Sequence, residues 1–121
     1  MASILSLAGR VFRTRNPARD ATTDRDRLLA IRTAVLEAIE GATRERDGLR
    51  QRVDDYYAQA SHLLDQSEYG KRSPKEEQAI VEAERYGALG LRRIEAINAQ
   101  LQRFGSILDV LGDENGESNA A

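Results

Sequence analysis

GKRSPKE, at residues 70–76, is the stretch that decides the fold. Gly70 can adopt the left-handed conformation that commonly ends a helix. Ser73 and Glu76 have the spacing of a capping box, in which the two side chains satisfy free N–H groups at the start of a helix. Pro74 stands at the first helical position, where its fixed φ suits the helix. A connection this short predicts two antiparallel neighbouring helices.

The residues before this turn carry a heptad repeat from about Asp24 to Ser67. One column consists of Leu28, Val35, Ala42, Leu49, Tyr56 and Leu63. The second column consists of Arg32, Ile39, Arg46, Val53, Ala60 and Ser67. Spacing that alternates between four and three residues keeps both columns on one helix face. The pattern predicts a long helix whose apolar seam is interrupted by arginines.

The residues after the turn carry a cleaner seam, from Pro74 to about Leu111. Its uncharged members are Ile80, Ala83, Gly87, Gly90, Ile94, Ile97, Leu101, Phe104, Leu108 and Leu111. Antiparallel pairing of the two seams places large residues opposite small ones, as dense packing requires. We therefore expect an all-α fold, built as a long antiparallel two-helix coiled-coil hairpin.

This register makes specific pairs. Val53 should face Gly90, and Tyr56 should face Gly87, which gives a mid-helix glycine a packing role. Arg46 should face an isoleucine of the second helix, with its stem packed and its guanidinium reaching water.

The sequence divides into four parts. We expect an amphipathic N-terminal helix at 1–15, a linker or helix entry at 16–23, the hairpin at 24–111 and a disordered acidic tail at 112–121. Pro17, like Pro74 at the turn, is the residue type favoured at the first position of a helix, so it also indicates a helix start.

Composition limits the function classes. The chain has 121 residues, no cysteine and a net charge of −2. This length fits one domain. The missing cysteine excludes disulfides and thiolate metal sites, and the charge gives no overall attraction to nucleic acid. No apolar run approaches the roughly 18 residues that span a membrane. Arginine far outnumbers lysine, which is typical of a bacterial protein from a high-GC genome.

Catalytic chemistry finds little support. The single histidine, His62, falls on a polar face of the first helix, and Asp54 and Asp55 are adjacent, so they point in different directions. The residue three before His62 is Gln59, so the Glu-x-x-His pattern of helical metal sites is absent. We expect no enzyme activity, no cofactor and no metal.

Apolar surface gathers at the end of the hairpin away from the turn, with Leu29 beside the first seam. In residues 1–15, one helical face is apolar and arginines lie mostly outside it. The predicted interaction residues are Ile4, Leu7, Arg10, Val11, Phe12, Arg13, Ile31, Leu36, Ile107 and Val110. The N-terminal helix could fold back to form a local three-helix bundle, two copies could form a dimeric four-helix bundle, or the free helix could bind a membrane or partner.

These features favour a non-catalytic interaction module: an adaptor, scaffold or structural subunit of a larger assembly, whose partner is another protein, itself or both. The alternative is a peripheral membrane protein anchored on an anionic surface by residues 2–15. A weaker alternative is nucleic-acid binding through the arginine-rich N-terminus. We expect a cytoplasmic location, with membrane association in the second case.

Overall fold

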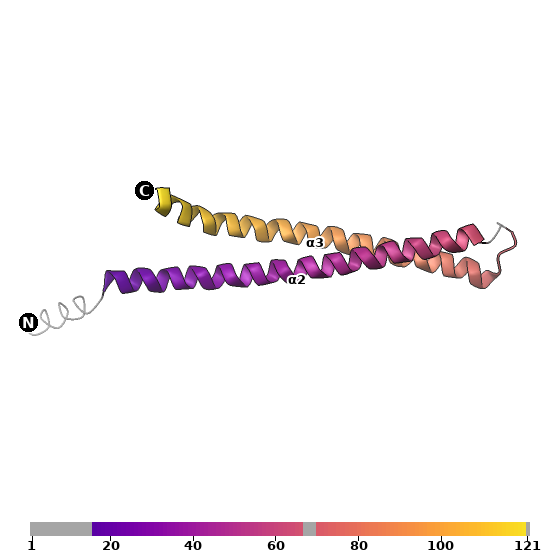
Figure 1. The fold of residues 1–121 in the computed structure, drawn as a ribbon, viewed down its shortest axis with the longest axis horizontal. Helices are drawn as coiled ribbons and strands as arrows, with labels where there is room; N and C mark the ends of the chain where they lie inside the picture. The colour runs from indigo at the N-terminus through magenta and orange to yellow at the C-terminus, as the bar shows by residue number, and fades with distance from the viewer. Residues whose placement is uncertain (1–15, 67–69, 121) are drawn as a thin grey trace, which may run out of the picture.

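The described part of the chain forms two long helices. The computed structural model describes residues 16–66 and 70–120, with side chains described through Gly112. Helix α2 spans Pro17–Gln66 and helix α3 spans Pro74–Ala120. They pack against each other as an extended antiparallel rod (Figure 1). No strand occurs among the described residues, and the predicted all-α hairpin is confirmed. The end with the connection is here called the tip, and the other end the open end.

The tip has the Ser73 half of the predicted capping box. Gly70 has a φ of 90° and so adopts the predicted left-handed conformation, within the connection between the two helices. The Ser73 side chain accepts a hydrogen bond from the backbone N–H of Glu76 at 3.2 Å. Arg72 lies against α3, with its side chain 10% exposed and a guanidinium nitrogen 3.1 Å from a Glu77 carboxylate oxygen. The turn therefore fixes the start of α3 through both backbone and side-chain contacts.

Helix α2 begins at Pro17, earlier than the predicted Asp24. The Asn16 side-chain oxygen accepts hydrogen bonds from the backbone N–H groups of Ala18 and Arg19 at 3.0 and 3.4 Å. Asn16 is thus the N-cap and Pro17 the first helical residue. The segment 16–23 is the cap and the first turns of the helix. The heptad pattern missed these turns because they precede its first apolar seam residue.

Helix α3 runs to Ala120, whereas an unstructured tail was predicted from residue 112. Gly112 does not end the helix, since an interior glycine costs only about 1 kcal/mol. No proline follows it to force a stop.

The core is densest between the tip and the middle of the rod. The buried apolar side chains are Val53, Ala60, Ile80, Ala83, Ile94 and Ile97, and Gly87 is buried among them. Toward the open end the seam is only half-buried, at Leu28, Arg32, Val35, Ile39, Leu101, Phe104, Leu108 and Leu111. The two helices therefore cover each other less completely at the open end.

The predicted register is confirmed at Val53 and Gly90. A β-carbon placed on Gly90 would overlap the Cγ2 methyl of Val53, so this side chain packs directly over the glycine. Further along the seam, Arg46 is 27% exposed and its guanidinium reaches Asp47 at 3.3 Å and Asn98 at 3.4 Å. This arrangement agrees with a packed stem and a polar head.

The predicted partner of Gly87 was wrong. A β-carbon on Gly87 would lie 2.8 Å from Cζ of Tyr57, so Tyr57 covers this glycine. Tyr56 is half-buried and pairs with Tyr86, with ring centroids 5.6 Å apart. Successive helical residues are about 100° apart, so both tyrosines border the seam, and the heptad pattern alone did not show which ring would cover the glycine.

We predict that Gly90→Ala destabilises the hairpin by about 1–3 kcal/mol, as overpacked core substitutions do. Val53 is β-branched and has little rotational freedom with which to avoid the new methyl group. Gly48→Ala is the control, because no atom lies within 4 Å of a β-carbon there. It should stabilise by up to about 1 kcal/mol through helix propensity. Chemical denaturation measures both, and equal stability of the two variants would contradict the close contact.

A salt bridge also joins the helices. Arg93 donates to both carboxylate oxygens of Glu45, at 2.8 and 3.1 Å. These hydrogen bonds lower the pKa of Glu45 below its ordinary value of 4.5. They also raise the pKa of Arg93. Because the folded pKa of Glu45 is depressed, its contribution to stability is present above pH 4.5 and is lost as pH falls through the folded value.

We predict that Arg93→Gln returns the Glu45 pKa toward 4.5. Carbon-detected NMR titration of the Glu45 carboxyl group measures this change. The neighbouring Arg92 is exposed, so Arg92→Gln should leave the Glu45 pKa where it is in the wild type. An unchanged value in Arg93→Gln would show that the bidentate pair does not form in solution.

Candidate interaction surface at the open end

The structure describes four of the predicted interaction residues, and all four are exposed. The exposed fractions are 49% for Ile31, 46% for Leu36, 43% for Ile107 and 65% for Val110. The remaining predicted residues, Ile4, Leu7, Arg10, Val11, Phe12 and Arg13, lie outside the described residues. The membrane alternative rests on that segment alone.

Three of these residues share one flank of the rod. Ile31 lies two heptads before Glu45, and Ile107 lies two heptads after Arg93. Because Glu45 and Arg93 bond across the seam, the two isoleucines occupy the equivalent positions nearer the open end. Val110 follows Ile107 by three residues and lies on the same side of α3. Ile31, Ile107 and Val110 are here called the open-end flank.

Leu36 lies on the opposite flank. It directly follows the seam residue Val35, whereas Ile31 directly precedes the seam residue Arg32. Heptad positions on either side of a two-column seam face opposite flanks. Leu29, one heptad before Leu36, shares its side. The sequence pattern predicted one apolar surface at this end, but the hairpin geometry separates these residues into two.

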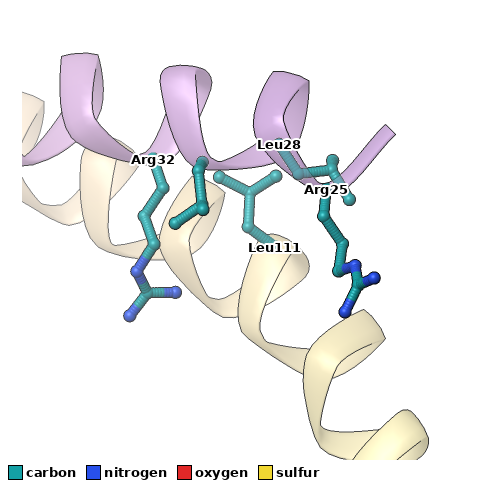
Figure 2. A pocket seen from close by; sticks show the side chains of 5 residues that line it. Arg25, Leu28, Arg32 and Leu111 are labelled. Carbon is teal, nitrogen blue, oxygen red and sulfur yellow. The ribbon is translucent and has the colours of Figure 1, made fainter. Parts of the chain in front are cut away.

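A groove opens on the Leu29 side of the open end. Its lining residues are Arg25, Leu28, Leu29 and Arg32 from α2 and Leu111 from α3. Figure 2 shows Leu111 reaching toward α2 between Arg25 and Arg32. The volume is about 180 Å³. An apolar floor between two guanidinium groups suits an apolar side chain that has a carboxylate nearby.

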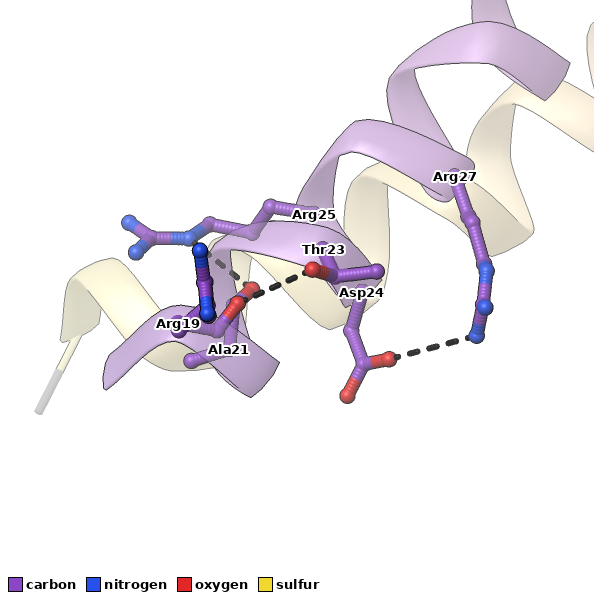
Figure 3. Close-up of polar contacts among 6 residues, drawn as sticks. All are labelled: Arg19, Ala21, Thr23, Asp24, Arg25 and Arg27. Carbon is purple, nitrogen blue, oxygen red and sulfur yellow. Dashed lines mark hydrogen bonds and ion pairs between the residues drawn. The ribbon is translucent and has the colours of Figure 1, made fainter. Parts of the chain in front are cut away.

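The first turns of α2 carry a polar hollow lined by Asp20, Thr23, Asp24 and Arg27. Figure 3 shows polar contacts in these turns. Thr23 donates its hydroxyl to the backbone carbonyl of Arg19 at 3.0 Å. Arg27 pairs with Asp24 at 3.8 Å, and both side chains are more than 70% exposed. These contacts run between neighbouring turns of one helix. Within residues 16–66 and 70–112, no group of three histidines, aspartates or glutamates could hold a metal ion.

The middle of the rod has another groove, with a volume of about 250 Å³. It is lined by Leu49, Arg52, Val53, Tyr56, Tyr86, Leu89, Gly90 and Arg93. The heptad pattern predicted that Tyr56 is a core residue, whereas its side chain is half-buried and lines this groove. His62 is exposed on α2. The groove brings together the phenol rings of Tyr56 and Tyr86 and the guanidinium groups of Arg52 and Arg93 over apolar side chains. Its lining residues do not include a nucleophile next to a base.

Neither described helix contains a stretch apolar enough to cross a bilayer. Comparisons with protein-family models, with curated proteins and with solved structures found no match to this chain.

Proposed function

We propose that this chain is a non-catalytic interaction module, an adaptor, scaffold or structural subunit of a larger bacterial assembly. The observation that carries the proposal is the open-end flank. There, Ile31, Ile107 and Val110 each leave between 43% and 65% of their surface exposed. Contiguous exposed apolar side chains mark interaction sites more often than scattered ones do, and these three side chains share one flank of the rod, which supports the proposal.

The open-end flank belongs to both helices. Ile31 comes from α2, and Ile107 and Val110 come from α3, so the surface exists only when the hairpin is formed and in register. An apolar helix of a partner could lie along it, in the manner of a helix bound in a groove. With 50 residues in α2, the rod is about 75 Å long. Such a rod can hold a partner at the open end far from the tip.

We predict that Ile107→Asp combined with Val110→Asp weakens partner binding about tenfold or more, because charges replace apolar contacts in the buried interface. Ala99→Asp combined with Gln102→Asp is the control. It adds the same charges at the same spacing on exposed positions away from the seam. Quantitative affinity purification from cells that express the chain measures partner recovery, and circular dichroism checks that both variants remain helical.

Wild type and control should recover the same proteins, and the flank variant should lose them. Equal recovery by all three proteins, or no specific recovery by the wild type, would contradict the proposed function.

A further inference from the structure

Helix α2 has a third heptad column beside its two seam columns. This column, here called the α2 stripe, consists of Leu29, Leu36, Thr43, Arg50, Tyr57 and Leu64. Leu29 and Leu36 lie before the polar pair Thr43 and Arg50, and Tyr57 and Leu64 lie after it. The side chains of these four apolar residues are between 38% and 57% exposed. A helix whose apolar surface is three columns wide is typical of a bundle, where it contacts more than one neighbour. In the hairpin, α3 covers the two seam columns and leaves most of the stripe open.

The length of the stripe limits what can cover it. Leu29 and Leu64 are 35 residues apart, which is about 52 Å along a helix. Residues 1–15, even if fully helical, would reach only about 22 Å. That segment is too short to cover the whole stripe. A second copy of this chain offers a helix of matching length, Pro17–Gln66.

The order of apolar and polar residues along the α2 stripe matches the order in a second, antiparallel copy of the same stripe. If two copies of α2 lie antiparallel about the midpoint of the stripe, Leu29 meets Leu64 of the second copy. Leu36 then meets Tyr57 of the second copy. A two-fold axis repeats each contact, as in most homodimers. Every large apolar member of the stripe therefore finds a large apolar partner.

The polar centre of the stripe also fits this orientation. Within the described side chains, Arg50 has no ion-pair partner. In the antiparallel pair it faces Thr43 of the second copy, whose hydroxyl can accept a hydrogen bond from the guanidinium. Glu40 and Asp47 lie three residues before and four residues after Thr43, so they border it on the helix surface. A parallel pair in register would instead place Arg50 against Arg50. Charge therefore selects the antiparallel arrangement.

The area is sufficient for a specific contact. A strip about 52 Å long and about 10 Å wide covers about 500 Å² on each copy, or about 1,000 Å² in total, which is near the lower bound for a biological interface. We propose that two copies of this chain associate side by side and antiparallel through the α2 stripe. The open-end flank lies on the other side of each hairpin and stays available, so this inference does not depend on the proposed function.

Sedimentation equilibrium of the full chain tests the proposal. The wild type should have twice the chain mass of 13.5 kDa, and Leu36→Glu should return the mass to that of one chain. Leu89→Glu is the matched control. Leu89 is 48% exposed on α3, on the flank opposite the stripe, and this variant should remain a dimer. Circular dichroism should show both variants folded.

Disulfide cross-linking tests the antiparallel orientation of the two copies. The chain has no cysteine of its own, so only the introduced cysteines can cross-link. A mixture of Leu29→Cys and Leu64→Cys chains should form a disulfide between the two variants, and Leu29→Cys alone should not cross-link. A monomeric wild type, a Leu36→Glu variant that stays dimeric, or a Leu29→Cys dimer linked to itself would each overturn the proposal. None of these results would affect partner binding through Ile107 and Val110, so the two ideas fail separately.

Discussion

Val53 packs directly over the backbone of Gly90, and the rest of the hairpin depends on this contact. A β-carbon at residue 90 would overlap the Cγ2 methyl of Val53, so either this side chain or the helices would have to shift, and glycine there permits the close approach. The contact also fixes the register. Once Val53 lies over Gly90, Arg46 falls beside Asn98, and every other column of the heptad repeat takes a defined place. The surfaces at the open end and along α2 follow from this one alignment.

Small residues near the tip and large residues near the open end give the rod its gradient of packing. Ala60, Ala83 and Gly87 are buried where the helices lie close. Toward the open end, Arg32 and Phe104 occupy the seam and stay half-buried. In Figure 1, α3 runs apart from α2 in this direction. Bulkier seam residues hold helix axes further apart, so the apolar side chains there cannot be fully covered by one facing helix.

The sequence was sufficient for the parts of the fold that local chemistry dictates. The cap at Ser73 and the left-handed Gly70 follow from residue type, and the Val53 and Gly90 pair follows from heptad arithmetic. The sequence did not predict which of two adjacent side chains packs against a given residue of the facing helix. Tyr56 was expected over Gly87, and Tyr57 lies there instead. The sequence pattern also merged Leu36 with the open-end flank, because a set of apolar residues beside a seam does not say which side each one takes.

A two-helix rod cannot bury an apolar surface that is three columns wide. In α2 the seam columns meet α3, and the stripe that includes Leu29 and Leu64 has no neighbour of matching length within the described part of the chain. In α3, Ile107 and Val110 extend the apolar surface to the other flank. The free energy gained by hydrophobic burial is roughly proportional to the apolar area removed from water, so each flank favours association. The two flanks face different directions. A second copy on one side and a partner on the other would cover both flanks, so the two proposals together describe the hairpin as an element that connects other molecules.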